Sequence, residues 1–459
     1  MDENNNSGSS VEQFGYKQEL KRVLTMKDLI VYGLLFIIVT APMGVFGEVH
    51  VLSHGMTPIV YLVGLVAMLF TALSYRQMSS RFPIAGSVYS YVQRGINPYI
   101  GFLVGWLIMI DYFLLPALNY GFVGAWCADL VPAIPTWVFI LILLGINTII
   151  TYRGISLMQV INWIVFIIQI IMVIVFIFLG IKFIMSGGGF GGFTTKPLYN
   201  AEFFNLSFIA TAATVACLSF LGFDAISTLA EETKNPEKNI GNGTVFTLLI
   251  VGALFFLITY VAASVWGDLP LEDLDPVTGI FQVAAMMGGD VLRVALTVAM
   301  LLGGAVGSLA AQAALVRILY SMSRDKMMPA FMSKVHPKYQ TPYITVLLIA
   351  VIIFIVSFIH PMQLVRFVNF GALSSFIMLN VAVFWFFFIR EKRRKTFNDF
   401  VAFFLFPAIG SFILGYVWSG FDGPTLALGF GWLAVGFIFA AIKTKGFKEV
   451  PEAFKNMSL

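Results

Sequence analysis

Two aspartates stand inside long apolar stretches of the sequence and are the first candidates for chemistry. Asp111 lies within the stretch 98–131, and Asp224 lies within the stretch 205–231. A charged side chain at the centre of a bilayer costs at least about 2.5–3.5 kcal/mol, so such a residue usually faces a cavity or a charged partner. Aromatic rings beside a carboxylate suit a cationic amine, and the aromatic neighbours here are Tyr112, Phe220 and Phe223.

Each aspartate also has a structural interpretation. Asp224 is followed by Ala225, Ile226 and Ser227 and could cap a helix that begins there, because Asp is a favoured N-cap residue. Asp111 could instead pair with a polar group on a neighbouring helix, or it could carry a proton. These roles stay open beside amine binding.

Helix-breaking residues interrupt two of the apolar stretches. Pro42, in Thr40-Ala41-Pro42-Met43-Gly44, has no amide hydrogen and clashes with the preceding turn, although it could be a simple kink. Gly222 loosens the second stretch just before Asp224. Backbone groups freed in mid-membrane must meet protein, water or a ligand. The candidate substrate-binding residues are therefore Ala41, Pro42, Met43, Gly44, Asp111, Tyr112, Ser219, Phe220, Gly222, Phe223 and Asp224.

The composition places these residues in a membrane protein. The chain has 459 residues, of which 59% are hydrophobic and 11% are charged. Soluble domains average about 45–50% apolar and about 25% charged residues. This composition excludes a soluble enzyme, a disordered chain and a nucleic-acid-binding protein, and the net charge of +4 implies no nucleic-acid partner.

The hydropathy pattern predicts an all-α integral membrane protein with twelve transmembrane helices. Each predicted segment is long enough to cross about 30 Å of hydrocarbon, which takes roughly 20 residues. Residues 1–24 and 444–459 are expected to be tails, and residues 25–443 a single transporter domain in contact with membrane lipid. The predicted spans are 27–53, 57–79, 98–131, 136–152, 156–186, 205–231, 241–266, 286–322, 341–360, 363–391, 398–418 and 424–443.

The distribution of basic residues predicts the orientation of these spans. Lys and Arg concentrate in cytoplasmic loops. With both termini cytoplasmic, all Lys and Arg residues fall in the tails and inner loops except Lys182, Lys196, Arg293 and Arg366. The acidic segment 267–275 then lies outside. We therefore expect a multi-pass protein of the plasma membrane with both termini in the cytoplasm.

Motifs for other kinds of chemistry are missing from the sequence. Nothing resembles a catalytic triad, a Walker loop or a metal motif, so we expect no enzymatic activity, no cofactor and no metal. Transport would then be driven by gradients or exchange. A non-transporting sensor should bring a soluble output domain and a channel should repeat a pore loop, and neither is visible in the sequence.

The two interrupted stretches also suggest an internal repeat. The first and sixth spans are interrupted, and the third and eighth spans are unusually long. An offset of five helices is odd, so the two units would be inverted. Interrupted helices at matching positions of inverted halves are the best pointer from sequence to a transporter's central site.

Three motifs resemble those of amino acid–polyamine–organocation permeases. The first is Phe82-Pro83-Ile84-Ala85-Gly86-Ser87-Val88-Tyr89-Ser90-Tyr91, and the second is Ser219-Phe220-Leu221-Gly222-Phe223-Asp224 with the acidic turn 231–236. The third is Arg317-Ile318-Leu319-Tyr320 with Ser323-Arg324-Asp325. Within that superfamily the sequence is most similar to bacterial putrescine importers. The resemblance implies a five-plus-five inverted-repeat fold, with broken helices 1 and 6, alternating access and a central site at those two breaks.

Two departures from the family pattern bear on the substrate. Amino-acid carriers of this family offer backbone amides to the substrate carboxylate from a Gly-Ser-Gly-like turn, where this chain has Pro42, Met43 and Gly44. Pro42 removes one donor, which favours a substrate without a carboxylate. Some proton-coupled members carry a lysine on helix 5 where Gln169 stands here, and Gln169 cannot titrate.

These observations predict a secondary active transporter that imports a polyamine or diamine similar to putrescine. Asp224 and Asp111 would balance its two ammonium groups. The alternative is a neutral or aromatic amino-acid permease of the same superfamily, and a non-transporting membrane sensor is a third, weaker alternative. Proton or sodium coupling stays open. Glu48, nearer the outer end of the first span, is expected in a solvated vestibule.

Overall fold

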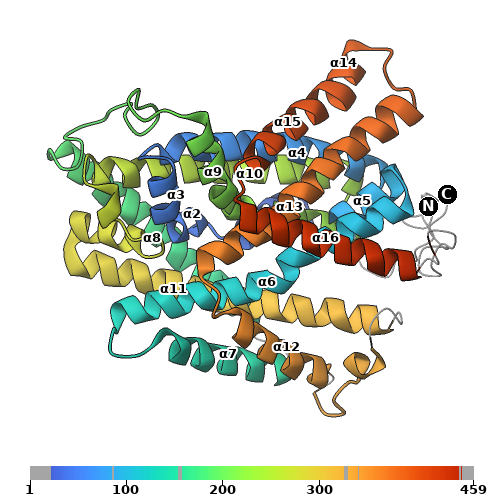
Figure 1. The fold of residues 1–459 in the computed structure, drawn as a ribbon, viewed down its shortest axis with the longest axis horizontal. Helices are drawn as coiled ribbons and strands as arrows, with labels where there is room; N and C mark the ends of the chain where they lie inside the picture. Colours follow the sequence, from blue (N-terminus) through green and yellow to red (C-terminus); the bar gives the residue numbers. More distant parts are fainter. Residues whose placement is uncertain are drawn as a thin grey trace, which may run out of the picture.

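The computed structural model describes residues 22–84, 87–153, 158–324, 329–339, 341–443 and Gly446. This part of the chain is helical and contains no β-strand (Figure 1). The longer helices are α1 (Met26–Ile37), α4 (Thr57–Arg81), α6 (Pro98–Leu130), α7 (Thr136–Arg153), α8 (Met158–Met185), α9 (Leu206–Ala216), α10 (Pro236–Trp266), α11 (Gly279–Arg324), α12 (Tyr343–Val356), α13 (Pro361–Val383), α15 (Phe406–Trp418) and α16 (Gly423–Lys443). Shorter elements are α2 (Ala41–Gly44), α3 (Phe46–Leu52) and α5 (Ser87–Gly95).

Eleven helical segments of the described residues are long and apolar enough to cross a membrane. The ninth predicted span, 341–360, coincides with α12, which has only 14 residues. The count of twelve spans and the inverted repeat therefore stay predictions. The predicted terminal tails lie outside the described residues, apart from residues 22–24 and Gly446.

The first span is interrupted just before Pro42 rather than at it. Helix α1 ends at Ile37, and Ile38 adopts a φ of 59°, which is unfavourable for a β-branched residue. Thr40 then precedes α2, in which Pro42 occupies one of the first two helical positions. A helix does not need an amide hydrogen there, so Pro42 lies at the start of α2 and does not break α1.

The sixth span is interrupted at Leu221 and Gly222. Helix α9 continues into a short 3-10 turn, η2 (Cys217–Phe220), and Leu221 is extended. Gly222 has a φ of 105°, in the left-handed region that favours glycine. The chain then enters η3 (Phe223–Glu232), which is a 3-10 helix. The interruption lies where the sequence predicted it.

The two interruptions touch each other. A Cβ atom added at Gly222 would lie 3.2 Å from the carbonyl oxygen of Phe36, in the last turn of α1. At the end of the molecule where α1 begins, the backbone amides of Val23 and Leu24 donate to the carbonyl of Glu232, and the amide of Lys234 donates to Leu24. The segments α1 and η3 are thus joined by backbone contacts at both ends.

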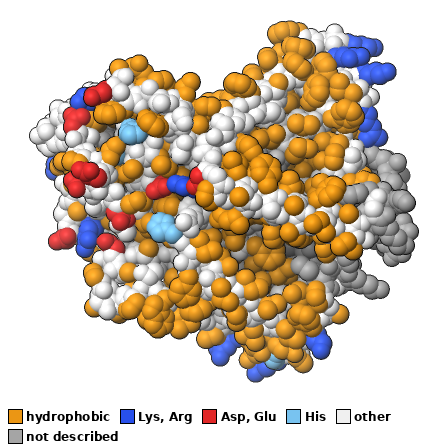
Figure 2. Space-filling model, viewed as in Figure 1, with side chains coloured by type: hydrophobic (Ala, Val, Ile, Leu, Met, Phe, Trp, Pro, Cys, Tyr) orange, Lys and Arg blue, Asp and Glu red, His pale blue; other side chains and the backbone are white. Residues whose placement is uncertain are grey.

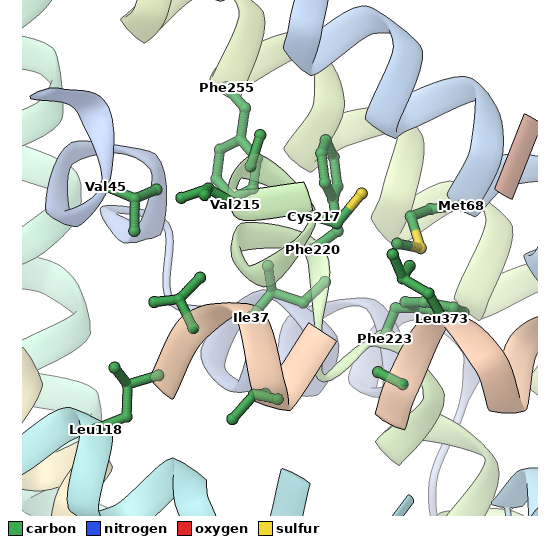
Figure 3. Packing of buried hydrophobic residues seen from close by; sticks show 14 of the residues in the cluster. Ile37, Val45, Met68, Leu118, Val215, Cys217, Phe220, Phe223, Phe255 and Leu373 are labelled. Carbon is green, nitrogen blue, oxygen red and sulfur yellow. The ribbon is translucent and has the colours of Figure 1, made fainter. Parts of the chain in front are cut away.

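Apolar packing surrounds this crossing. Ile37, Phe220 and Phe223 are almost fully buried and lie close to the interrupted segments (Figure 3). Helix α10 packs along α4, and α6 packs against both α13 and α11. These long helices form a continuous framework around the two short interrupted ones.

Charged side chains are distributed unevenly over the surface. In the view of Figure 2, acidic side chains gather at the left end, whereas the right and lower edges show Lys and Arg. The acidic residues Asp268, Glu272, Asp273 and Asp275 lie in the connection between α10 and α11.

Replacement of Gly222 by alanine tests the tight crossing. We expect Gly222→Ala to lower the free energy of unfolding by about 1–2 kcal/mol, because the left-handed conformation is costly for a residue with a Cβ. The matched control is Gly415→Ala in α15, where no atom lies within 4 Å of the added Cβ. That control should be neutral or stabilising by up to about 1 kcal/mol. Equal melting temperatures for both variants in detergent would contradict the crossing.

Candidate functional site

Asp111 and Asp224 come from different parts of the fold. Asp224 lies in the first turn of η3, directly after the interruption of the sixth span, and Asp111 lies in the middle of α6. Both residues are partly buried. Helix α5 packs against both α6 and η3, so it lies beside the elements that carry the two aspartates.

The carboxyl group of Asp224 is held by the start of α5. The Ser87 hydroxyl donates a hydrogen bond to Oδ2 of Asp224 at 3.1 Å. The Tyr75 hydroxyl lies 3.3 Å from the same Ser87 oxygen. Because Ser87 has a single hydroxyl hydrogen, Tyr75 is the donor in this second contact. Ser87 has a φ of 52°, so the backbone at this point is constrained to place that hydroxyl.

The two aspartates are carried by α6 and η3, which both pack against α5. Oδ1 of Asp111 is buried and has no hydrogen-bond partner. Within the described residues, neither aspartate forms an ion pair with Lys or Arg. The arrangement is therefore a pair of carboxyl groups for which the described residues supply no cationic partner.

Asp224 does not act as the N-cap of η3. The residue in that position is Gly222, and no side chain caps the helix. Asp224 instead lies one residue inside η3, where a negative charge still interacts favourably with the helix N-terminus. Its side chain accepts the hydrogen bond from Ser87.

The aromatic and hydroxyl residues around Asp224 pack into the framework. The rings of Phe223 and Tyr75 meet edge to face, with centroids 5.6 Å apart. The hydroxyls of Ser219 and Tyr61 are 2.9 Å apart, and Phe220 is fully buried with its ring 6.0 Å from that of Tyr61. These contacts hold the interrupted span in place, and direct contact of Ser219, Phe220 and Phe223 with a substrate stays a prediction.

The predicted residues of the first span lie in α2, which packs against α10 and against η2 of the sixth span. Pro42, Met43 and Gly44 are buried, and Ala41 is partly buried. A Cβ atom at Gly44 would lie 3.3 Å from the ring of Trp126 on α6. This close approach of backbone to an indole ring explains why a glycine stands at position 44.

Gln169 contacts the eighth span rather than the aspartates. Its amide nitrogen lies against Gly303 of α11, and a Cβ atom added at Gly303 would clash with it. Gln169 is buried, and the lack of a side chain at Gly303 makes room for it. It therefore serves in packing between α8 and α11, and it brings no titratable group to this interface.

Sequence reasoning missed an ion triad at the acidic end of the molecule. Arg366 of α13 donates to Glu48 of α3 at 2.7 Å and to Asp422, just before α16, at 2.6 Å. The side chains of Arg366 and Glu48 are only 21% and 14% exposed, so Glu48 is not in open solvent. Hydrogen bonds from Thr425 and Arg366 hold the pKa of Asp422 below its usual value although partial burial opposes this.

Ser87 was also missed as a site residue, although it lies in one of the quoted motifs. The signal available in the sequence was the pair Gly86-Ser87 between two helical segments, which indicates a helix start but not its partner. Ser87 and its partner Asp224 are 137 positions apart in the sequence, and Arg366 and its partner Glu48 are 318 positions apart. No local sequence pattern connects residues so distant.

Many apolar helices around an interrupted central pair define a multi-pass membrane permease. The chain matches the amino acid permease family over residues 30–442, and it belongs to that family, within the amino acid–polyamine–organocation superfamily. The resemblance seen in the motifs is thus confirmed, and the family indicates a transporter rather than an enzyme.

Several characterised relatives cover nearly the whole chain. The low-affinity putrescine importer PlaP of Escherichia coli is 32% identical over 96% of this chain and 97% of its own length. The branched-chain amino acid permease BcaP of Bacillus subtilis is 28% identical over 80% of this chain and 81% of its own length. The methylthioribose transporter of the same species is 27% identical over 91% of this chain and 92% of its own length.

Neutralising Arg366 tests the ion triad. We expect Arg366→Gln to lower the free energy of unfolding by about 2 kcal/mol, because it leaves the carboxylates of Glu48 and Asp422 unpaired in a partly buried place. The control is Lys196→Gln, which breaks an exposed ion pair with Asp268 and should change stability by less than about 1 kcal/mol. Thermal melting in detergent measures both, and equal small shifts would show that the triad does not hold the two helices together.

Proposed function

We propose that this permease is a secondary transporter that imports a diamine similar to putrescine across the plasma membrane by alternating access. The observation that carries this proposal is the pair Asp111 and Asp224, which lie on two elements packed against α5 and have no cationic partner in the described residues. The similarity to a putrescine importer over 96% of the chain supports it.

The charge of the site favours a dication over a monocation. Two like charges in a membrane interior repel strongly and are costly to keep ionised. One ammonium group offsets one carboxylate, so a diamine can offset both. The five bonds between the nitrogens of extended putrescine, each about 1.5 Å long, separate them by about 6 Å. The hydroxyl of Ser87 and the ring of Tyr112 would complete the polar and aromatic walls.

The ion triad of Arg366, Glu48 and Asp422 is a candidate for the contact that closes the outer path. Arg366 joins the outer half of the first span, through Glu48, to the tenth span and to the start of the twelfth. Alternating access requires the outer and inner paths to open in turn. We propose that the triad is formed when the outer path is closed and separates when it opens.

Coupling to a proton or sodium gradient is a further part of the proposal. The side-chain amide of Gln169 does not ionise, so it cannot carry the driving proton. If the driving ion is a proton, Asp111 and Asp224 are the titratable groups of the described site that could carry it. A proton on one carboxyl group would also remove the repulsion between them when no substrate is bound.

A neutral amino-acid permease is the second candidate function. The similarity to BcaP, at 28% identity over 80% of this chain, favours it. Such a substrate would use backbone amides at the interruption near Gly44 and would need only one carboxylate, for its amino group. The two candidates therefore differ in whether both aspartates contribute to affinity.

Neutralising each aspartate separates these candidates. If a diamine binds, Asp111→Asn and Asp224→Asn should each weaken putrescine far more than butylamine, a monoamine of equal length. Loss of a charge-assisted hydrogen bond is worth about 1.5–3 kcal/mol, or roughly ten- to hundredfold in affinity. Competition against uptake of labelled putrescine into liposomes gives both affinities.

The matched control is Asp290→Asn, whose side chain is 92% exposed. It should leave both affinities unchanged. Unchanged putrescine affinity in Asp111→Asn and Asp224→Asn, with melting lowered only in the second, would reject the diamine site. Affinity for leucine lost in Asp224→Asn but retained in Asp111→Asn would instead support the amino-acid permease.

Cysteine labelling tests the proposed orientation. In a background without Cys127 and Cys217, a cysteine at Glu272 should react with a membrane-impermeant reagent in intact cells. A cysteine at Lys395 should react only after the cells are opened, because the Lys- and Arg-rich loop is expected in the cytoplasm. Labelling at position 395 from outside would reverse the orientation.

A further inference from the structure

The hairpin of the tenth and eleventh spans projects from the rest of the molecule (Figure 1). Helix α13 continues into the π-helix η6 (Phe384–Arg390), and the chain returns through α14 (Phe397–Phe400) and the π-helix η7 (Val401–Leu405) into α15. The turn between them, residues 390–395, contains Arg390, Lys392, Arg393, Arg394 and Lys395 and is exposed. We call this segment the basic turn.

Most of the positive charge of the basic turn is not matched by acidic side chains. Glu391 is paired with Arg81 at 3.3 Å, and Asp399 is paired with Arg393 at 3.6 Å. Within the described residues, Arg390, Lys392, Arg394 and Lys395 form no ion pair. The guanidinium groups of Arg390 and Arg394 lie over the rings of Phe386 and Phe388, at 5.7 and 6.0 Å, which fixes their direction.

An apolar groove runs between the two helices of the hairpin, further into the membrane region. It has a volume of about 200 Å³ and is lined by Asn380, Val381, Phe384, Phe404, Pro407 and Ala408. The amide nitrogen of Asn380 is buried and has no hydrogen-bond partner, while its oxygen accepts from Ser74. The groove is thus lined mainly by apolar side chains, and one of its lining residues has an amide nitrogen without a partner.

The groove and the basic turn lie next to each other on the hairpin, as the acyl chain and the headgroup of one lipid do. Phe384 lines the groove and Arg390 begins the basic turn, and the two residues are the first and last of the short helix η6. In Figure 2, Lys and Arg side chains at the tip of the projecting hairpin border a surface of hydrophobic side chains. A headgroup at the turn would leave its acyl chain beside the groove.

We propose that the hairpin binds one anionic phospholipid of the adjacent leaflet, with its phosphate on the basic turn and an acyl chain in the groove. Clusters of Lys and Arg next to a membrane span attract anionic lipids. The apolar groove, which phosphate alone cannot use, distinguishes a bound lipid from a free phosphate ion. This inference concerns a surface away from the aspartates and does not depend on which substrate is transported.

Charge bias alone would give a different behaviour from a bound lipid. Cytoplasmic loops carry Lys and Arg in membrane proteins generally, and such a loop attracts any anion without regard to its tail. A site made of turn and groove together should instead require both a negative headgroup and a long acyl chain. It should also saturate at one lipid.

Native mass spectrometry of the full-length protein in detergent tests the proposal. The probes are dioleoylphosphatidylglycerol, dioleoylphosphatidylethanolamine, the short-chain dihexanoylphosphatidylglycerol and inorganic phosphate. We expect one saturable phosphatidylglycerol per chain with the long-chain lipid, and binding at least about tenfold weaker with each of the other three probes.

Two variants divide the site into its parts. Lys392→Gln/Lys395→Gln should weaken long-chain phosphatidylglycerol about tenfold or more, because each juxtamembrane cation contributes appreciably to attraction. The matched control is Lys334→Gln/Lys338→Gln, two exposed lysines of another loop, which should have little effect. Ala408→Trp, which fills the groove, should weaken the long-chain lipid but not change the weak binding of the short-chain one.

Each contrary result overturns the proposal. Equal binding of the short- and long-chain lipids, or no effect of Ala408→Trp, would mean a diffuse electrostatic attraction. Equal loss in the target and control lysine variants would mean that charge anywhere on this face is sufficient. Melting curves of all three variants in detergent establish that any loss of binding occurs in folded protein.

Discussion

The structure depends on one electrostatic constraint, which is the pair of carboxyl groups on Asp111 and Asp224 in an otherwise apolar interior. No Lys or Arg of the described residues neutralises them. An unpaired buried charge is among the most destabilising features a fold can carry. The Ser87 hydroxyl donates to Asp224, but a hydrogen bond from a hydroxyl does not balance a charge. The proposed diamine, or a proton, would supply that balance.

The interrupted helices explain how the chain reaches this arrangement. An unbroken sixth span would place residue 224 on a helix whose backbone groups are all satisfied internally. The left-handed Gly222 instead turns the chain so that Asp224 begins a new half-helix next to α1. Ile38 carries the corresponding strain in the first span, of the order of 1–3 kcal/mol. Buried packing around Phe220 and Phe223 offsets that cost.

Long, strongly apolar elements could be predicted from the sequence, because hydropathy and length are properties of contiguous residues. Eleven spans follow from them, and the two interruptions were located to within a few residues. The exact break in the first span was placed at Pro42, but proline is favoured at a helix start, and the chain uses Ile38 instead. The short α12 also shows that an apolar stretch can be longer than the helix it forms. The last four residues of the predicted span, Ser357 to His360, form a turn instead of helix.

The polar contacts of the site could not be predicted in the same way. Asp111 and Asp224 attract attention in a sequence because each is a charge within an apolar run. Ser87 and Arg366 do not, since their roles depend on partners from distant spans. Glu48 illustrates the difference, because its position near the end of a span suggested solvent, whereas Arg366 encloses it in an ion triad.

Equilibrium binding to the purified protein tests the central claim most directly. Labelled putrescine would be competed by unlabelled α,ω-diamines of different lengths, by butylamine and by leucine. If the site binds a diamine, diamines near the length of putrescine should compete best. Butylamine and leucine should compete at least about tenfold more weakly, because each offsets only one of the two carboxylates. Leucine or butylamine competing as well as putrescine would contradict it.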